Sequence, residues 1–360
     1  MAKGPTAYDV AERAGVSIAT VSFTFRQPKK VKESTRALVH AAALELGYIP
    51  SASARGLAGG RTGALGLLSL ERRPSRPESE STSPWVDMNV DCRYYPVYVD
   101  EVQRGVEEEC WRRGYALMVA NATRSNRNAV LTDIAGRVDG LAITSGAFPD
   151  ADLHRIAARL PVAILAESGP DDDLSRVAVD NAAGMRELTE HLVRDHGFRN
   201  LLFVGPLYDA DRIERFQAFR AALHAAGLPV PDKSLATTAG FREMARTGVY
   251  REMVADLTSR SALPDAFVCV SDEVALALMD ALRDAEIDVP GRVAVTGFDG
   301  IVAGRLVSPA LTTVRQPMPA LGVMVVEVLA SRIEHPDERP ESRRLPVRLE
   351  VRQSCGCPEG

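Results

Sequence analysis

Residues 6–28, TAYDVAERAGVSIATVSFTFRQP, have the pattern of two short helices joined by a tight turn. Thr6 and Asp9 have the Thr-x-x-Asp spacing that is typical of a helix start. Apolar residues then recur with helical spacing and predict one buried face: Ala7, Val10, Ala11 and Ala14. Gly15 ends this helix, and Ser17 is placed to cap a second one. Two helices on so short a turn form a helix-turn-helix.

The second predicted helix, residues 18–26, has an inward and an outward side. Val21 and Phe25 fall on the inward side, toward the first helix. In a helix-turn-helix the N-terminal part of this helix enters the DNA major groove, so its other residues and the helix starts are candidate DNA contacts. These candidates are Thr6, Ser17, Ile18, Ala19, Thr20, Ser22, Phe23 and Arg26. A plain corner between two core helices has the same pattern, and this stretch alone does not separate the two interpretations.

Residues 33–46 predict a third amphipathic helix, which ends at Gly47. Six short motifs occur in order between residues 9 and 57. They are Asp9-Val10-Ala11, Ala14-Gly15-Val16-Ser17, Ala19-Thr20-Val21-Ser22, Thr35-Arg36, Leu46-Gly47-Tyr48-x-Pro50 and Ala52-x-Ala54-Arg55-x-Leu57. We refer to such short motifs as sequence words. In these words the chain resembles the LacI/GalR family of bacterial transcription regulators. The resemblance implies that residues 1–50 are an all-α helix-turn-helix DNA-binding domain.

The charge of the chain is divided between a basic head and an acidic body. Residues 1–62 contain nine Lys and Arg against four Asp and Glu, a net charge of +5. Because the whole chain carries −5, the remaining residues carry about −10. Attraction to a polyanion is therefore concentrated where the helix-turn-helix lies.

Residues 51–62 match the hinge of the family. The resemblance implies that this hinge folds into a short helix on the operator, with Ala54, Arg55 and Leu57 at the minor groove. Gly56 stands where a larger residue is usual, which weakens such a helix. A flexible tether is the alternative interpretation.

From residue 63 the chain alternates short apolar runs with helical patterns. The runs that predict buried strands are 64–70, 115–120, 138–144, 162–166, 201–205, 266–270 and 293–298. The helical patterns are 98–113, 185–196, 212–226, 243–257, 273–285 and 318–333. Such alternation predicts an α/β core of parallel sheets, with a pocket at the carboxyl ends of the strands.

The resemblance continues through this core. Its matching words are Arg137-Val138-Asp139-Gly140-Leu141, Val179-Asp180-Asn181, Gly205-Pro206-Leu207, Arg215-x-x-x-Phe219, Ser271-Asp272, Gly297-Phe298-Asp299 and Leu311-Thr312-Thr313-Val314-Arg315-Gln316-Pro317. It implies a periplasmic-binding-protein-like core of two parallel-sheet subdomains, with crossings near 180, 311 and 342. Subdomain one would then be about 63–180 and 312–342, and subdomain two 181–311 and 343–360.

The resemblance also implies a cleft between the subdomains that holds a small-molecule effector. Position by position it assigns the effector-binding residues Tyr98, Glu167, Arg215, Phe241, Ser271 and Asp299. An Arg fork, a carboxylate and aromatic faces suit a polyhydroxylated or heteroaromatic molecule, most readily a carbohydrate. In the alternative interpretation, Arg215 is a surface residue paired with Glu214 or Asp211. Asp299 then has no contact with an effector and merely stabilises the turn at 297–300.

Three departures limit the resemblance. Phe23 replaces an Arg that reads guanine in many members, so it offers apolar contact alone, and the operator sequence cannot be transferred. Ala166 stands where an Asp is frequent, with Glu167 next to it. Residues 71–93 form an inserted loop rich in Pro, Ser and Glu. This insertion is either a solvated loop or a lid over the cleft that includes Trp85.

We expect a transcriptional repressor that binds a pseudo-palindromic double-stranded DNA operator as a homodimer, paired through helices near 98–113 and 126–136. Two alternatives remain: a constitutive DNA-binding regulator with a vestigial cleft, and a sugar-binding protein or enzyme with an incidental head. The common catalytic motifs are absent from the sequence, so no enzyme is expected.

No apolar run marks a signal peptide or membrane span, so a cytoplasmic location is expected. Five cysteines without Cys-x-x-Cys spacing argue against a disulfide framework. Cys355-Gly-Cys357 could bind a metal or sense redox state, but no His lies near it in the sequence, and the six His appear scattered on helical faces. Neither a cofactor nor a metal is therefore predicted.

Overall fold

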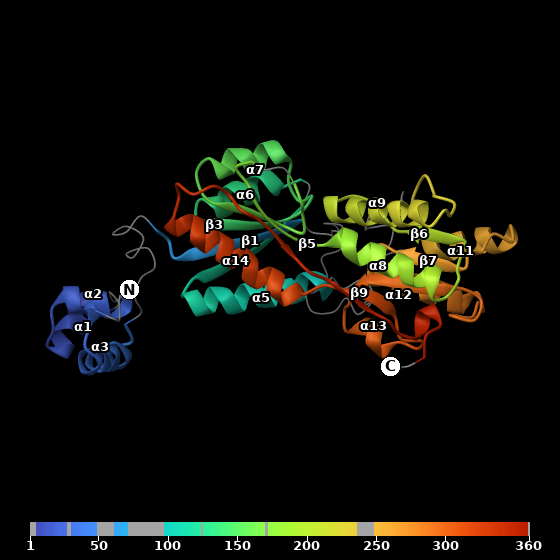
Figure 1. Cartoon of the computed structure of the whole chain (residues 1–360). Helices are drawn as coiled ribbons and strands as arrows, with labels where there is room; N and C mark the ends of the chain where they lie inside the picture. Colours follow the sequence, from blue (N-terminus) through green and yellow to red (C-terminus); the bar gives the residue numbers. More distant parts are fainter. Residues whose placement is uncertain are drawn as a thin grey trace, which may run out of the picture. The chain divides into compact units, whose positions relative to one another are not determined.

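The structure is a computed structural model that describes residues 5–26, 30–48, 61–70, 97–123, 125–169, 172–235 and 248–358 (Figure 1). The chain divides into two compact units, residues 1–63 and 64–360. Several predicted features lie outside the described residues: Ala54, Arg55 and Leu57 of the hinge, the insertion at 71–93, and Phe241. The side chain of Arg26 also lies outside them.

The first unit has the three predicted helices, α1 (Ala7–Ala14), α2 (Ile18–Arg26) and α3 (Glu33–Leu46). The Asp9 carboxylate accepts hydrogen bonds from the Thr6 backbone N–H (2.6 Å) and hydroxyl (2.7 Å). Gly15 adopts the left-handed conformation (φ 67°) that turns the chain out of α1. Ser17 Oγ then accepts a hydrogen bond from the Thr20 N–H (3.1 Å), as expected of an N-cap.

A small apolar core holds these helices together. One fully buried valine comes from each helix, namely Val10, Val21 and Val39. On the same side of α2, the Phe25 ring packs edge-on against His40 of α3, with ring centroids 5.1 Å apart. The inward side predicted for α2 is therefore confirmed.

The second unit begins with a six-stranded sheet in the order β10-β5-β4-β3-β1-β2, in which all strands are parallel. The strands are β1 (Ala64–Leu70), β2 (Ala116–Ala122), β3 (Gly140–Thr144), β4 (Val162–Leu165), β5 (Ser175–Val179) and β10 (Ser342–Leu345). Successive residues of β1 point to opposite faces: Leu65 and Leu67 join one apolar cluster, and Leu68 joins another. A sheet buried on both faces explains why its strands read as continuous apolar runs.

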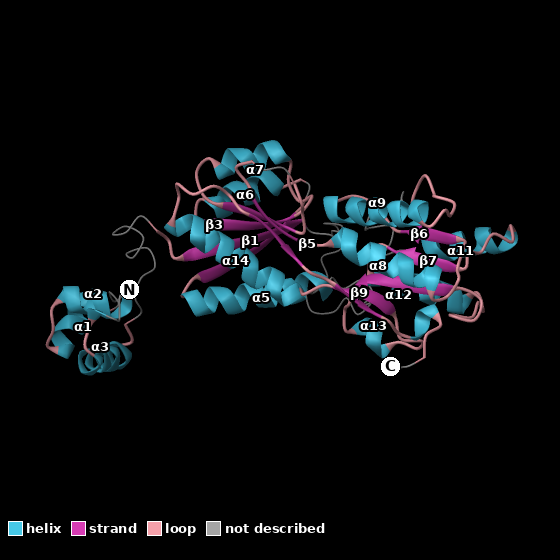
Figure 2. Ribbon diagram, viewed as in Figure 1, coloured by secondary structure: helices cyan, strands magenta, loops and turns pink. Residues whose placement is uncertain are grey.

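Helices cover both faces of this sheet (Figures 1 and 2). They are α5 (Val97–Arg113), α6 (Arg127–Ala135), α7 (Asp150–Ala157) and α14 (Met318–Glu334). α5 and α14 pack very closely, since a Cβ atom at Gly105 or Gly322 would collide with backbone atoms of the other helix. Glycine is therefore required at this crossing.

A second sheet has the order β11-β9-β8-β7-β6, parallel except for the antiparallel pair β11 and β9. Its strands are β6 (Leu201–Val204), β7 (Ala266–Cys269), β8 (Ala294–Asp299), β9 (Thr312–Arg315) and β11 (Arg348–Glu350). The accompanying helices are α8 (Asn181–Arg194), α9 (Ala210–Ala225), α11 (Gly248–Ser259), α12 (Asp272–Asp284), α13 (Ala303–Leu306) and the 3-10 helix η3 (Gln353–Cys355).

Two of the predicted crossings lie later in the chain than expected. β9 pairs with β8 in the second sheet, so the chain crosses after Arg315 and not near 311. β10 pairs with β5 in the first sheet, so the last crossing follows Leu345 and not 342. The physical reason is that long-range pairing decides which sheet a strand joins, and a local apolar pattern does not record it. The first crossing falls at Asp180, between β5 and α8.

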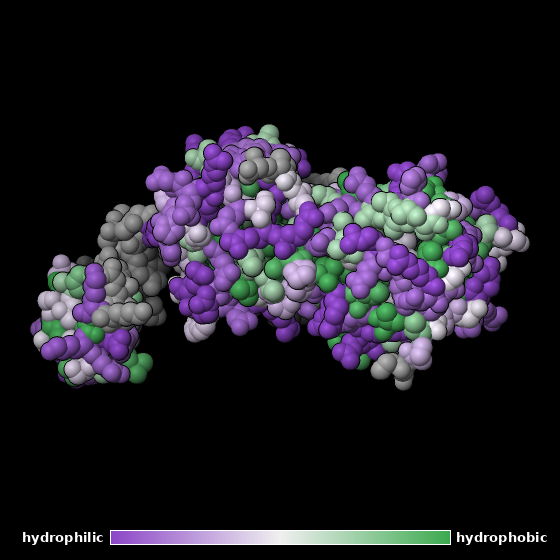
Figure 3. Space-filling model, viewed as in Figure 1, coloured by the Kyte–Doolittle hydropathy of each residue, from purple (hydrophilic) through white to green (hydrophobic). Residues whose placement is uncertain are grey.

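Among the described helices, none combines the length and apolar character that a membrane span requires. Figure 3 shows hydrophilic residues over much of the visible face of the α/β unit, with smaller apolar areas between them.

Candidate DNA-reading surface and effector cavity

The exposed side of α2 carries two large apolar side chains. Ile18 and Phe23 have 39% and 44% of their surface exposed, while Val21 beside them is buried. The Lys30 Nζ atom lies 5.8 Å from the centre of the Phe23 ring. Ser17 and Ala19 are also exposed, whereas Thr6, Thr20 and Ser22 are half-buried. Because Ile18 and Phe23 contribute little to the core, they are free to make apolar contacts such as those with a thymine methyl group.

A cavity of about 320 Å³ lies between the two halves of the α/β unit, at the carboxyl ends of strands from both sheets. Its size is within the ordinary range for small-molecule sites. Of the predicted effector residues, Tyr98, Arg215 and Asp299 line it together. Tyr98 comes from α5 in the first half, and the other two come from the second half. Burial raises the pKa of the Tyr98 hydroxyl, which keeps it a neutral hydrogen-bonding group.

Arg215 is buried, with 4% of its surface exposed, and is fixed from several sides. Its Nε donates to Asn181 Oδ1 (2.8 Å), and its Nη1 donates to the Val270 carbonyl (2.8 Å). The guanidinium carbon lies 3.9 Å from the centre of the Phe298 ring. Arg215 is therefore not the surface residue that the alternative interpretation described.

Asp299 faces Arg215 across 3.4 Å, between its Oδ1 and the Arg215 Nη1. The same oxygen accepts a hydrogen bond from Gln316 Nε2 (2.6 Å). Asp299 has a backbone φ of 137°, which is rare outside glycine and typical of functional sites. Burial raises the pKa of its carboxyl group, and the Arg215 charge opposes that rise. The residue therefore presents a strained, desolvated carboxylate to the cavity.

Asp272 supports this wall from behind. Its Oδ2 accepts from the backbone N–H groups of Gly300 (2.8 Å) and Ile301 (2.9 Å), and its Oδ1 accepts from the Thr313 hydroxyl (2.5 Å). Burial, together with the nearby Asp299 charge, raises the pKa of Asp272 to about 7. Asp272 thus holds the loop that carries Asp299.

Two cavity residues that the sequence analysis missed are Asp211 and Arg212, on the same helix as Arg215. Arg212 Nε donates to Asp209 Oδ2 (3.1 Å). Among the described residues, no group makes a hydrogen bond with the buried Arg212 Nη1 or with either oxygen of Asp211. Burial raises the pKa of Asp211 to about 6. The spacing of Arg212 and Arg215, three residues apart, was the available signal, since it puts both on one helix face.

Polar groups of the first half complete the cavity. Ser69 Oγ donates to Asn121 Oδ1 at the ends of β1 and β2, and both side chains line the space. Ser145, which also lines it, donates to Glu167 Oε2 (2.7 Å). Glu167 itself is not among the lining residues and lies 3.5 Å from the Arg176 guanidinium, between Oε1 and Nε. The structure thus gives Glu167 a supporting position behind Ser145.

Ser271 also differs from the expectation. It is buried outside the lining of the cavity, and its Oγ accepts a hydrogen bond from the Val274 N–H (3.4 Å) at the start of α12. A helix N-cap is therefore the role that the structure supports for Ser271. Ala166 does line the cavity, with a left-handed backbone (φ 59°).

Comparison of the chain with known proteins shows the family to which it belongs. Residues 6–51 match the family described as bacterial regulatory proteins, lacI family, and residues 189–355 match the periplasmic binding protein-like domain. The ribose operon repressor of Escherichia coli (strain K12) is 31% identical over 352 residues, covering 96% of this chain and 98% of that protein. This chain belongs to the LacI family.

Solved structures of this LacI-family type agree with the fold. The lac repressor dimer bound to operator and the anti-inducer ONPF aligns with a TM-score of 0.74 at 25% identity, covering 98% of this chain and 99% of that one. A complex of the transcriptional regulator CelR with cellobiose aligns with a TM-score of 0.67 at 27% identity, covering 97% and 99%. The predicted fold class, a helix-turn-helix head with a periplasmic-binding-protein-like core, is confirmed.

Proposed function

We propose that this LacI-family protein is a ligand-responsive repressor that binds a pseudo-palindromic operator as a homodimer. A carbohydrate-like effector binds in the cavity between the two halves of the core and changes operator affinity. A protein with this task works on chromosomal DNA in the bacterial cytoplasm. Because a ligand shifts an equilibrium only through different affinities for two states, the cavity must differ between the operator-bound and released forms.

The observation that carries the proposal is the set of buried, unsatisfied polar groups on the cavity wall. Arg212 Nη1 makes no hydrogen bond among the described residues, and the Asp211 carboxylate has a long ion pair with Arg215 (Oδ2 to Nη2, 3.9 Å) in place of a hydrogen bond; both residues line the cavity with Asp299. An unsatisfied buried polar group costs about 1–3 kcal/mol, so a bound molecule that pairs with these groups gains free energy. Sugar hydroxyls both donate and accept hydrogen bonds, which suits a wall with both kinds of group.

The relatives support the same class of effector. The ribose operon repressor carries a sugar in its name, and the CelR complex contains cellobiose. For the dimer, support comes from the lac repressor dimer and from Trp111 on α5, the helix expected to pair. Trp111 has 87% of its surface exposed, and so large an exposed aromatic side chain suits a subunit interface.

The first experiment selects bound fragments from random duplex DNA with the full-length protein at two salt concentrations. We expect an enriched inverted repeat, because a dimer places two α2 helices in successive major grooves. Sequence-blind binding that disappears at the higher salt concentration would contradict the proposed readout, since phosphate attraction alone behaves in that way.

The second experiment titrates the selected operator complex with a panel of mono- and disaccharides that includes ribose and cellobiose. Arg212→Gln should abolish the response to an active sugar and leave effector-free operator affinity unchanged. Arg260→Gln is the matched control, because Arg260 is exposed and pairs only with Asp256 (3.2 Å) among the described residues. An unaltered response in the Arg212 variant would remove Arg212 from the effector site.

A constitutive regulator with a vestigial cavity is the second candidate function. Ala166 favours it, because its methyl group offers no hydrogen bond at a cavity position where the family often has Asp. That candidate predicts that no member of the panel changes operator affinity.

A further inference from the structure

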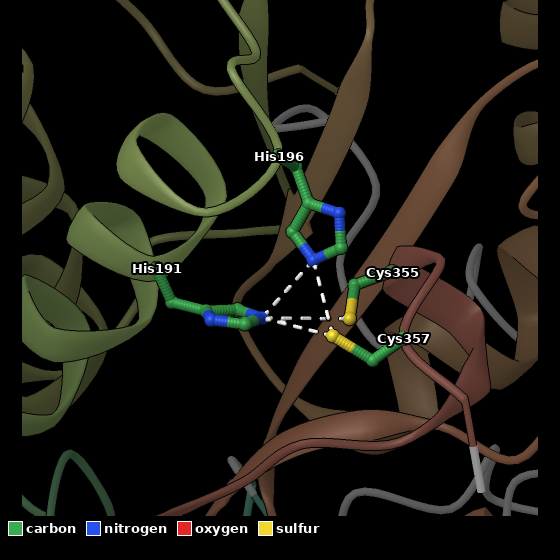
Figure 4. A group of neighbouring side chains, drawn as sticks. All are labelled: His191, His196, Cys355 and Cys357. Carbon is green, nitrogen blue, oxygen red and sulfur yellow. Dashed lines mark hydrogen bonds between the residues drawn. The ribbon is translucent and has the colours of Figure 1, made fainter.

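Two histidines and two cysteines that are far apart in the sequence converge in the second half of the core (Figure 4). His191 lies in the last turn of α8, and His196 follows in the loop after it. Cys355 ends η3, and Cys357 lies two residues later. Figure 4 shows the four side chains pointing toward one centre, with the two imidazoles facing the two thiols. No His lies near the cysteine pair in the sequence, but the fold brings two to it, so the reason for predicting no metal does not hold.

Four of the six distances between the donor atoms have the values of a tetrahedral site, and all four atoms lie within 4.8 Å of one another. Zn–N bonds of about 2.0–2.1 Å and Zn–S bonds of about 2.3 Å imply tetrahedron edges of roughly 3.3 Å between nitrogens and roughly 3.5 Å between nitrogen and sulfur. His191 Nε2 and His196 Nε2 are 3.2 Å apart. His191 Nε2 lies 3.6 Å from Cys355 Sγ and 3.7 Å from Cys357 Sγ, and His196 Nε2 lies 3.3 Å from Cys357 Sγ.

We propose that His191, His196, Cys355 and Cys357 bind one zinc ion through His191 Nε2, His196 Nε2 and the two thiolate sulfurs. Two imidazoles and two thiolates are a donor set that favours zinc among the common divalent ions, whereas magnesium and calcium prefer oxygen. Two thiolate charges balance the charge of the ion, so the loaded site is electrically neutral. Neutrality suits its position, because Cys355 is fully buried and the side chain of His191 is 9% exposed.

The groups around the four ligands hold them in the required orientation. His191 Nδ1 lies 2.7 Å from Asp195 Oδ2, so an Nδ1–H donated to this carboxylate leaves Nε2 free to bind the ion. The His196 ring stacks on Phe198, with centroids 5.2 Å apart. Gly356, between the cysteines, has a φ of 102°, a conformation that favours glycine and allows both sulfurs to point to the same side.

The position of the site indicates what the ion does. Four protein ligands complete a tetrahedron and leave no open position for a substrate, which is the arrangement of a structural zinc site. The site joins the end of α8 to the segment after β11, which lies beyond the last crossing between the halves. Zinc therefore fastens the C-terminal segment to the second half of the core, independently of the effector cavity.

The test begins with the full-length protein, purified with a thiol reductant and without chelator. We expect one equivalent of zinc per chain by elemental analysis. Cobalt(II) added to chelator-stripped protein should give the thiolate charge-transfer and tetrahedral ligand-field absorption bands of a Cys2His2 site. Zinc restored to the stripped protein should raise its melting temperature, because binding to the folded state alone stabilises it. The cobalt spectrum requires no variant, so misfolding cannot obscure it.

Variants then assign the ligands. Cys357→Ser and His196→Asn should each lose the cobalt bands, whereas Cys110→Ala and His224→Asn should retain them, because these two residues lie on other helices. Asp195→Asn should weaken zinc affinity about 10- to 100-fold, the usual effect of removing a carboxylate that orients a histidine ligand.

Either of two results would overturn the proposal. One is wild-type protein that takes up no zinc or cobalt when the thiols are reduced. The other is a disulfide between Cys355 and Cys357, found by mass spectrometry in protein isolated under reducing conditions.

Discussion

At the scale of single residues, Ala166 is in a conformation that suits its side chain poorly. It has a φ of 59° at the end of β4, where the chain turns along the cavity wall. The left-handed region costs an ordinary L-residue about 1–2 kcal/mol, and Asn and Asp tolerate it best because their side chains can hydrogen-bond locally. This strain gives a physical reason why an acidic residue would suit the position.

Ala166→Asn should therefore stabilise the core by about 1 kcal/mol. The increase should appear in urea unfolding as a higher midpoint with an unchanged m-value. Ala158→Asn is the matched control, since Ala158 is exposed and has an ordinary φ of −64°. An equal effect in both variants would show that backbone strain at Ala166 is not the cause.

Asp211 predicts a pH dependence of stability. Its pKa is raised by burial from the ordinary 3.8 to about 6, so between these values the folded state binds more protons than the unfolded state. Its contribution to stability is therefore complete below about pH 4 and is lost as the pH rises through 6. Asp211→Asn cannot ionise and should remove this loss, which amounts to about 3 kcal/mol. Urea unfolding at pH steps from 4 to 7 measures it, and parallel curves for the two proteins would contradict the prediction.

The cavity residues show how far position-by-position resemblance reaches. Arg215, Asp299 and Tyr98 were predicted from the family resemblance and line the cavity together, because the chain shares the fold of that family. Arg212 was missed because its helical spacing from Arg215 was not used, and its unsatisfied Nη1 is visible only in the folded chain. Ser271 was assigned to the effector but caps α12, a use that Ser at a strand-to-helix junction serves equally well.

At the scale of elements, variants of Ser17, which caps α2, can test the stability of the helix and its expected contact with DNA separately. Ser17 Oγ accepts a hydrogen bond from the Thr20 N–H and lies on the exposed side of the head. Ser17→Ala should destabilise the first unit by about 1 kcal/mol, and Ser17→Asp should keep its stability, because Asp also caps helices well. Ser17→Asp should nevertheless weaken operator binding, because a carboxylate repels DNA phosphates. Thermal unfolding and operator titration of both variants measure the two effects. Wild-type operator affinity in the Asp variant would place Ser17 away from DNA.

Long apolar runs made most strands and helices predictable. A strand that carries a charged residue was harder to recognise from the sequence. β5 was missed because Arg176 interrupts its apolar pattern. In the structure Arg176 is 4% exposed, and its Nη1 donates to Asp172 Oδ1 (2.6 Å). The charge is thus neutralised by a pairing that only the folded chain supplies.

At the scale of the whole molecule, the sequence could not show which distant segments meet. The sheet that receives β9 or β10 depends on pairing across the fold. In the same way, His191 and Cys355 are neighbours only because β11 returns the chain to the second half after the last crossing. Separations of this length exceed any motif spacing, which is why the cysteine pair looked isolated.

The effector cavity and the operator surface should be coupled with equal strength in both directions. If a sugar changes operator affinity by some factor, the operator must change the affinity for that sugar by the same factor, typically 5- to 150-fold. Calorimetric titration of the active sugar into free protein and into the operator complex should therefore give two dissociation constants whose ratio equals the shift in operator affinity. In the Arg212→Gln variant, the sugar should no longer change operator affinity measurably, and the operator should no longer change sugar affinity measurably. Equal sugar affinity in the two forms would mean that the cavity binds without signalling, and the constitutive alternative would then describe this protein better.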